Sequence, residues 1–480
     1  MAWTGDTLSV LTEILNERPM DDVVESMGFR NAIYNRIMKT SREEDFYGEY
    51  AKLLIHTTAP MNAVPRVEGG LVVLPGADVF KELHIKEAQY MASVGWTQEE
   101  IELAVRKKGS ALIDLVNLKL KNAPLDLRYK LNLAFMGDGT GRLCRLSAAI
   151  GGAGGSGTVA APYYGTCTVD NTTGDFGIVG TSHLRNGMLV DIYTIGSVTT
   201  GFPTGATFTK KVIGMVVSDI TGTTFKITQT QEADYYLTTL ADDDVVFVHD
   251  SINVSGTTFV SWNGSMGLYG IVDGGGCAAN EFTDSGNLYN GSFSGVSFQG
   301  LSRTTYPQLK ARVARADTWG AGTAGTAMAC DLGIINAEIR KIDEESETGG
   351  EVTALYMNGA TRDWMAGLAY AQQNAFVQVT GGKIIPGMPN ITGFRSATGR
   401  IIPVIPASQM PDGHIMGGDE RDLILFQSVP LDWYTGMGSK SFPSPGTRDL
   451  TFESWLRTKC MLAARRCDNW FRLEDIDLTA

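Results

Sequence analysis

Apolar residues recur every three or four positions between Ser110 and Met136, and this pattern most constrains how the 480-residue chain can fold. The spacing places these residues on one side of an α-helix, about 40 Å long at about 1.5 Å per residue. Charged and polar residues occupy the opposite side. The predicted apolar face consists of Leu112, Val116, Leu120, Ala123, Leu127, Leu131 and Phe135.

Both the course and the end of this helix have sequence signals. Pro124 lacks a backbone donor and crowds the preceding turn, so we expect a kink near Leu120. The glycines of residues 137–141 can adopt the left-handed conformation of a helix C-cap, so the helix is expected to end there. The same GDGTGR stretch lacks the GxxxxGK[ST] spacing and follows a helix, so phosphate binding is not indicated.

The first 97 residues have few features that demand a compact core. Residues 1–52 favour helical pieces of mixed polarity, the most amphipathic of which ends at Pro19. Residues 61–97 favour two long strands joined by a turn at Pro75-Gly76. An isolated hairpin is marginal in water, so we expect this one to lie on a neighbouring surface of its own or another subunit.

The composition changes abruptly at Gly151. Residues 151–300 hold 26 of the 56 glycines but only four lysines or arginines. The stretch GGAGGSGTVAAPYYGT is expected to be a flexible linker. Four short strands are predicted after it, in LRNGMLVDIYT, KKVIGMVVSDIT, TTFKITQTQ and DDDVVFVHDSI. The pattern predicts an inserted all-β domain, a small antiparallel barrel or sandwich, over residues 151–290.

Helices and strands alternate after Ala327. The segments MACDLGIINAEIRKIDEESE and ATRDWMAGLAYAQQN favour helices, and EVTALYMNG between them favours a strand. Strand-rich segments follow as far as RDLILFQSVP. The last segment, FESWLRTKCMLAARRCDNWFRLEDI, is apolar enough to pack as either a helix or a strand.

Bulk properties limit the partners of the chain. A formal net charge of −13 repels phosphate backbones and anionic lipid, so sequence-specific recognition of nucleic acid is not expected. Neither a long apolar run nor a signal peptide is present, so we expect no membrane insertion or export. The cysteines show no CxxC spacing and are expected to be free thiols in a reducing cytosol: Cys144, Cys167, Cys277, Cys330, Cys460 and Cys467.

Catalytic constellations are not found. The sequence has neither G-x-S-x-G nor HExxH, and its five histidines are dispersed. The acidic run at residues 242–244 could attract a divalent cation, but such a run is more often a solvated turn before a strand. We therefore expect no enzyme activity, no cofactor and no dedicated metal site.

Between residues 82 and 143 a charged alternating strand (ELHIKEAQYMASVGWT), a helix entry (GSALIDL), a helix body (LDLRYKLNLAFM) and its glycine-rich end (GDGTGRL) follow one another. This order resembles the major capsid proteins of tailed bacteriophages with the Hong Kong 97-like fold. The resemblance implies an α+β fold with an N-terminal arm (1–52), an extended β loop (53–97), a peripheral domain with a long spine helix (98–150), the inserted all-β domain (151–290), a return to the peripheral domain (291–325), an axial domain (326–445) and a C-terminal peripheral segment (446–480).

The resemblance also implies a function. The chain would self-assemble into hexamers and pentamers that form an icosahedral head around double-stranded DNA, in a virion assembled in the bacterial cytoplasm. The apolar spine face would be its assembly element. Further partners would be a separate scaffolding protein, because residues 1–52 are short and not heptad-rich, a portal, a decoration protein, and DNA held by weak non-specific contact.

Two alternatives remain open from the sequence. An encapsulin-type cellular shell of the same fold would enclose a protein cargo instead of DNA. A secreted glycan-binding or hydrolytic protein is suggested by the glycine-rich β segment and by Tyr163, Tyr164 and Trp262. The missing signal peptide and the missing pair of carboxylates oppose the second alternative.

Overall fold

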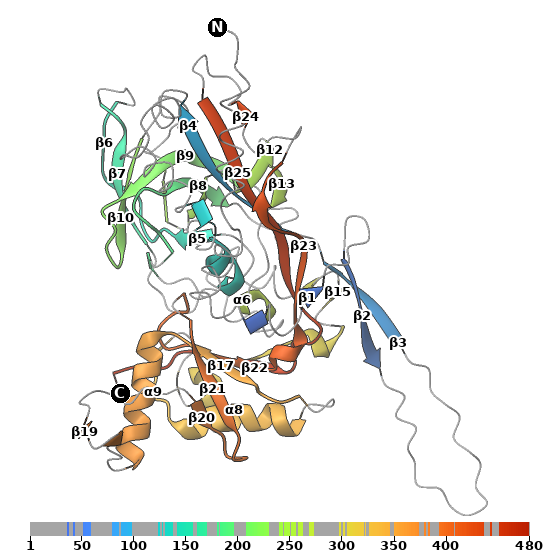
Figure 1. Ribbon diagram of the computed structural model, residues 1–480. Coiled ribbons are helices and arrows are strands. Elements are labelled where there is room, and N and C mark those ends of the chain that lie inside the picture. Colours follow the sequence, from blue (N-terminus) through green and yellow to red (C-terminus); the bar gives the residue numbers. More distant parts are fainter. Residues whose placement is uncertain are drawn as a thin grey trace, which may run out of the picture.

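In the computed structural model, the described part of the chain forms three main β-sheets and a projecting hairpin (Figure 1). No described helix is long and apolar enough to cross a membrane. The described residues are 36–37, 42–43, 51–58, 79–85, 88–97, 123–124, 127, 130–137, 142–156, 161–169, 180–181, 183–195, 208–229, 240–242, 244–249, 251–255, 258–262, 268–272, 297–298, 301–302, 305–320, 322, 326–345, 350–373, 379–380, 383–384, 393–407, 409–435, 442–443 and 451–479.

A mixed six-stranded sheet lies at the bottom of Figure 1, with two helices beside it. Its strand order is β16 (Arg312–Ala314), β26 (Trp470–Leu473), β22 (Ile415–Gly418), β17 (Ala354–Met357), β21 (Ile401–Pro406) and β20 (Gly393–Arg395). The two predicted helices and the strand between them are confirmed as α8 (Leu332–Glu345), α9 (Gly359–Gln373) and β17.

Local capping and spacing explain these helices. Ile335, Ile339 and Ile342 share one face of α8 and are at most 1% exposed, in one apolar cluster with the sheet. The Asp331 side chain accepts a hydrogen bond from the Ile334 amide at 2.9 Å and caps the start of α8. Asn358 does the same for α9, because its side-chain oxygen accepts from the Thr361 amide at 2.8 Å.

A second sheet is built on a long central strand, β25 (Thr451–Ala464). β25 pairs with β23 (Leu423–Trp433), β24 (Phe442–Pro443) and β4 (Ala88–Thr97), all antiparallel. The C-terminal segment, left open from the sequence, is therefore two strands, β25 and β26. Alternate side chains of β25, from Phe452 to Leu462, are buried on one face of the sheet.

The third sheet is antiparallel, and it carries the strands predicted between residues 184 and 252. Its order is β5 (Arg142–Arg145), β11 (Val245–Val248), β8 (Leu189–Ile195), β9 (Phe208–Ser218), β10 (Thr224–Thr228), β7 (Tyr164–Thr168) and β6 (Gly151–Gly154). A bridge between Leu146 and Val169, with a 3.0 Å hydrogen bond from the Ser147 amide to the Thr168 carbonyl, joins β5 back to β7. The sheet thus closes on itself, and we call it the barrel.

The prediction of a flexible linker after Gly151 is wrong for the described residues. β6 and β7 form a hairpin there, closed by a 2.9 Å hydrogen bond from the Ser156 amide to the Ala161 carbonyl. Gly155 has φ +91°, and a Cβ on it would lie 2.1 Å from the Pro162 carbonyl oxygen. This glycine allows a tight turn rather than a mobile tether.

Shorter elements connect the sheets. They are the hairpin of β12 (Ile252–Ser255) and β13 (Thr258–Trp262), the single turn α6 (Leu268–Ile271), the hairpin of β14 (Ser297–Phe298) and β15 (Leu301–Ser302), η2 (Pro307–Leu309), α7 (Ala316–Trp319), the hairpin of β18 (Val379–Thr380) and β19 (Lys383–Ile384), and η3 (Glu420–Asp422).

Candidate assembly surfaces

A hairpin of β2 (Ala51–Thr58) and β3 (Val79–Ile85) projects from the body of the chain (Figure 1). One face of it is anchored, since Leu53, Leu83 and Ile85 are at most 8% exposed and join the largest apolar cluster of the chain. The anchored face fixes the direction in which the hairpin leaves the body, because alternate residues of a strand point to opposite faces.

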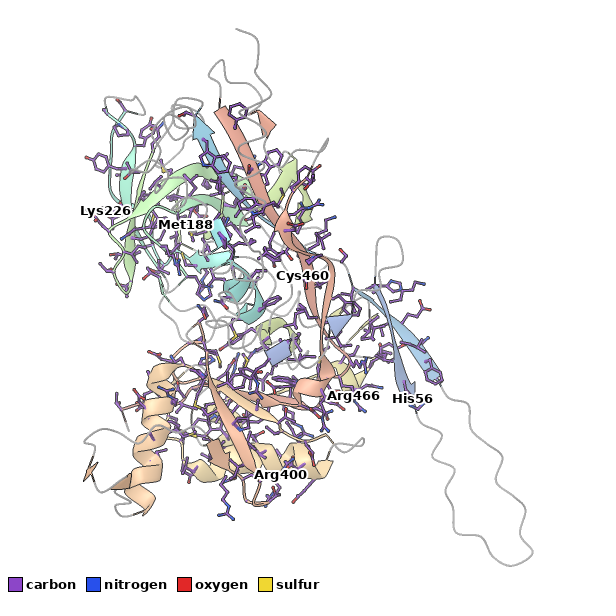
Figure 2. All side chains as sticks on the ribbon, viewed as in Figure 1. His56, Met188, Lys226, Arg400, Cys460 and Arg466 are labelled. Carbon is purple, nitrogen blue, oxygen red and sulfur yellow. The ribbon has the colours of Figure 1, made fainter. Side chains whose placement is uncertain are left out.

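The other face of the hairpin carries apolar side chains in solvent. Leu54 is 61% exposed and Phe80 52%. The His56 ring lies 4.9 Å from the Phe80 ring, and Figure 2 shows His56 on the hairpin, far from the barrel residue Lys226. Large apolar side chains gathered on a projecting element are typical of a contact surface for another chain.

A polar group lies beside Leu54 on the same face. Lys52 Nζ lies 3.0 Å from Glu82 Oε2, and His84 Nε2 lies 3.7 Å from the same oxygen, with all three side chains about half exposed. The lysine lowers the pKa of the Glu82 carboxyl, which lies at the surface. Apolar side chains next to polar and charged ones are usual in a protein interface.

The structure corrects the predicted course of the β excursion. The strand that pairs with Val79–Ile85 is Ala51–Thr58, which the sequence had placed in helical pieces and at the start of the loop. Ala88–Thr97 does not continue the hairpin; it pairs with β25, and Trp96 is 1% exposed in the chain's own core. The signal that could have found β2 is the alternation of Ala51, Leu53 and Ile55 with Lys52 and His56, which Leu54 interrupts.

The predicted spine helix is described in part. Ala123, Pro124, Leu127 and residues 130–136 are helical, and the helix ends before Gly137, as predicted. The Gly137 amide donates to the Leu133 carbonyl at 2.8 Å. Leu112, Val116 and Leu120 lie outside the described residues, as does the predicted kink.

The four described residues of the predicted assembly face pack inside the chain itself. Ala123 is 5% exposed, Leu127 0%, Leu131 2% and Phe135 1%, all in the largest apolar cluster. This burial positions the helix within the chain, and the assembly role of the face stays a prediction.

The N-terminal arm is also docked where the structure describes it, although its sequence has few features that demand a compact core. Ile37 is 2% exposed in the largest cluster, and β1 (Arg42–Glu43) pairs in parallel with Leu425 and Phe426 of β23. The Arg36 guanidinium donates two hydrogen bonds of 2.6 Å to the Glu420 carboxylate, which also accepts from the Tyr356 hydroxyl. A bidentate pair of this kind fixes geometry as well as charge.

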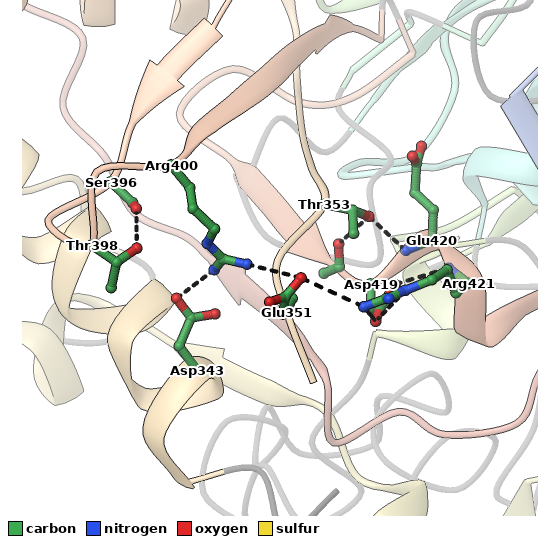
Figure 3. Close-up of polar contacts among 10 residues, drawn as sticks. Asp343, Glu351, Thr353, Ser396, Thr398, Arg400, Asp419, Glu420 and Arg421 are labelled. Atoms are coloured by element: carbon green, nitrogen blue, oxygen red, sulfur yellow. Dashed lines mark hydrogen bonds and ion pairs between the residues drawn. The ribbon is translucent and has the colours of Figure 1, made fainter. Parts of the chain in front are cut away.

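A belt of charge crosses the surface of the six-stranded sheet module (Figure 3). Arg400 pairs with Asp343 of α8 and lies 3.3 Å from Glu351, and Arg421 lies 3.8 Å from Glu351 and 2.7 Å from Asp419. The belt joins α8, the turn between β20 and β21, and the turn before β23. Because Arg421 and Glu351 are 60% and 56% exposed, this pair contributes little to stability on its own.

A second cluster of charged side chains is buried beside β22 and β26. The Glu474 carboxylate pairs with Arg472 and, at 2.6 Å, with Arg315, and all three side chains are at most 9% exposed. His414 lies 3.9 Å from the same carboxylate and 3.0 Å from the Tyr269 hydroxyl. Arg472 also donates to the Val272 carbonyl at 2.8 Å, so the cluster ties the α6 turn to the six-stranded sheet.

Burial and charge set the protonation of this cluster. Burial raises the pKa of Glu474, but Arg472, Arg315 and His414 outweigh it and bring the pKa to about 2. Burial lowers the pKa of His414 to about 4, helped by the two arginines and opposed by Glu474. At neutral pH the cluster therefore holds a charged glutamate and a neutral histidine.

The acidic run before β11 has a structural role in its described part. Asp244 is fully buried, and its carboxylate accepts from the Ala241 amide at 2.7 Å and from the Thr194 hydroxyl. It stabilises the turn that begins β11, so the predicted turn before a strand is confirmed, but Asp244 is buried in it and not solvated as predicted. Five of the six cysteines are described, and all five are buried free thiols.

No family model matches the chain, and no curated protein matches it. Solved structures do match. The chain is similar to a chain of the cyanophage A-1(L) capsid asymmetric unit, with 11% identity over 94% of this chain and 92% of that one and a TM-score of 0.46. It is similar to a chain of the capsid of the native GTA particle, with 10% identity over 92% and 90% and a TM-score of 0.36.

A shorter match is to the holo-SrpI encapsulin complex from Synechococcus elongatus PCC 7942. It has 15% identity and a TM-score of 0.21, and it covers 32% of this chain and 51% of that one. The two capsid matches, by contrast, extend over at least 92% of this chain.

Proposed function

We propose that the chain is a major capsid protein that assembles with copies of itself into the closed head of a tailed bacteriophage. The observation that carries the proposal is the β2–β3 hairpin, anchored on one face by Leu53, Leu83 and Ile85 and apolar on the face turned to solvent. A monomer gains nothing by holding Leu54 and Phe80 in water. A neighbouring subunit that covers them gains about 25 cal/mol for each Å² of apolar surface removed from water.

Three further features support a structural subunit. Leu127, Leu131 and Phe135 bury the spine helix in the chain's own core, and the anchored face of the projecting hairpin packs in the same core. Hexamers and pentamers with rotational symmetry would place the hairpin of each copy on the next. A net charge of −13 limits the affinity of a shell for the DNA that it encloses.

Residues 151–290 would then supply all of the barrel except β5, which precedes them in the chain. The six-stranded sheet with α8 and α9 would be the axial domain, to which β16 and β26 are added from outside residues 326–445. The head would form in the bacterial cytoplasm with a separate scaffolding protein and a portal, and a decoration protein could bind outside. DNA would be held by weak contacts without sequence preference.

The test is a charge placed on the hairpin. Phe80→Glu leaves the monomer folded, because this side chain is 52% exposed, but it puts a carboxylate in the proposed contact. We expect the association constant of each contact to fall at least about tenfold, a loss of about 1.4 kcal/mol per contact, and the assembled fraction measured by sedimentation to fall as a result.

Tyr164→Glu is the matched control, since Tyr164 is an aromatic residue of the barrel with 51% exposure. It should leave assembly nearly unchanged. Equal assembly of the Phe80→Glu variant and the unaltered chain, or an equal loss in both variants, would refute the role of the hairpin.

A further inference from the structure

One segment of the N-terminal arm is attached to the body by contacts that a second copy could supply equally well. We name this segment the strap: Arg36, Ile37 and β1. Its contacts are an ion pair to Glu420, one buried side chain, and backbone pairing with Leu425 and Phe426. The strap and its binding site run in the same direction, because Arg36 pairs with Glu420 and β1, further along the chain, pairs in parallel with Leu425 and Phe426.

The binding site presents a nearly buried carboxylate to the strap. Glu420 has only 9% of its side chain exposed, and its carboxylate accepts from both Arg36 and the Tyr356 hydroxyl. Its amide donates to Thr353 Oγ1 at 2.9 Å, which fixes the backbone from which the carboxylate projects. A nearly buried carboxylate without a positively charged partner costs free energy, so the folded chain is more stable when a guanidinium pairs with Glu420.

The strap can nevertheless be released. Arg36 is 37% exposed, so water reaches the ion pair, unlike the Glu474 cluster, in which the carboxylate is 1% exposed. β1 contributes two residues of pairing at the edge of the β1–β23–β25 sheet. Its removal would uncover the edge of β23, and an open edge pairs readily with another strand.

The strap is also linked to the hairpin. Seven residues separate Glu43 from Ala51, the first residue of β2, so the two elements stay within roughly 30 Å of each other. When the hairpin of one copy binds a neighbouring subunit, the strap of that copy is therefore also close to that subunit.

We propose that the strap is exchangeable: the socket formed by Glu420, Tyr356 and the edge of β23 binds the strap of a second copy of this chain as it binds its own. The exchange rests on the proposed function, because a shell brings copies together. The docking can be measured without a shell, on the full-length chain before assembly.

The experiment opens the socket in the full-length chain and refills it with a labelled peptide of residues 34–45. Arg36→Glu in the chain places a carboxylate against Glu420 and displaces the chain's own strap. We expect the unaltered peptide to bind this variant at least about tenfold more tightly, by fluorescence anisotropy, than it binds the unaltered chain. The Arg36→Glu peptide should not bind the variant.

Charge reversal provides the matched control. A chain with Glu420→Arg repels its own Arg36, and it should bind the Arg36→Glu peptide in preference to the unaltered peptide. Arg36→Ala in the chain opens the socket without adding charge, so it serves if Arg36→Glu fails to fold. Equal binding of both peptides to every chain, or no binding to any opened chain, would overturn the proposal.

Failure of the exchange and failure of the proposed function are distinguishable. A chain that forms shells but whose opened variants bind no peptide refutes the exchange alone. If the opened variants bind the peptide with the expected charge preference but the chain never forms shells, the capsid function is refuted. The proposed socket is then still supported.

Discussion

Replacing Glu474 by glutamine removes the negative charge between Arg315 and Arg472 and should strongly destabilise the chain. The arginines hold the pKa of this buried carboxyl at about 2, against its ordinary value of 4.5. A pKa that differs by one between the folded and unfolded chain corresponds to about 1.4 kcal/mol, so the charged form contributes about 3 kcal/mol at neutral pH. Breaking a buried pair by removing one partner costs about 3–5 kcal/mol, which agrees.

The sign follows from the direction in which the pKa moves. Because the pKa of Glu474 is lower in the folded chain, its contribution is complete above the unfolded pKa of 4.5 and disappears as the pH falls through about 2. The measurement is the free energy of unfolding in urea at pH 7. Glu344→Gln is the matched control, because Glu344 is 67% exposed and 3.8 Å from Arg340, and it should cost less than about 1 kcal/mol. Similar losses in the two variants would refute the role assigned to the buried cluster.

Two further predictions concern acid stability and the barrel. Burial lowers the pKa of His414 in the folded chain to about 4, so its contribution to stability is complete above pH 6.5 and disappears as the pH falls to 4. Lowering the pH from about 7.5 to 5 should therefore lower the free energy of unfolding of the unaltered chain by about 2 kcal/mol more than that of the His414→Gln variant. A variant with the same acid sensitivity as the unaltered chain, in urea unfolding at about pH 7.5 and 5, would contradict this. Gly155→Ala should lower the free energy of unfolding by about 1–3 kcal/mol because of its positive φ and the nearby Pro162 carbonyl, whereas Gly222→Ala, with no atom within 4 Å of the added carbon, should be close to neutral. Equal urea midpoints for these two variants would show that Gly155 is not needed for the turn.

Features set by neighbouring residues were predictable from the sequence. The end of the spine helix before Gly137, the helices around β17 and the strands of the barrel all rest on local periodicity, caps and turns. The glycine-rich stretch at residue 151 was misread because composition does not distinguish a tether from a tight hairpin. The position of Pro162 beside Gly155 decides between them.

Pairings between distant segments were not predictable in the same way. β4 reads as the continuation of β3, yet its partner is β25, more than 350 positions away in the chain. The strap was missed for the same reason, since nothing around Arg36 indicates a partner at Glu420. The burial of the spine face within the chain likewise depends on segments that contribute to one core from both ends of the sequence.

Electron microscopy of the full-length chain, expressed with and without a scaffolding protein, shows whether the chain is a shell subunit. We expect closed shells built from rings of five and six subunits, in which the β2–β3 hairpin of each copy lies on the next. A population of dispersed monomers under every condition, with Leu54 and Phe80 still in contact with water, would contradict this expectation.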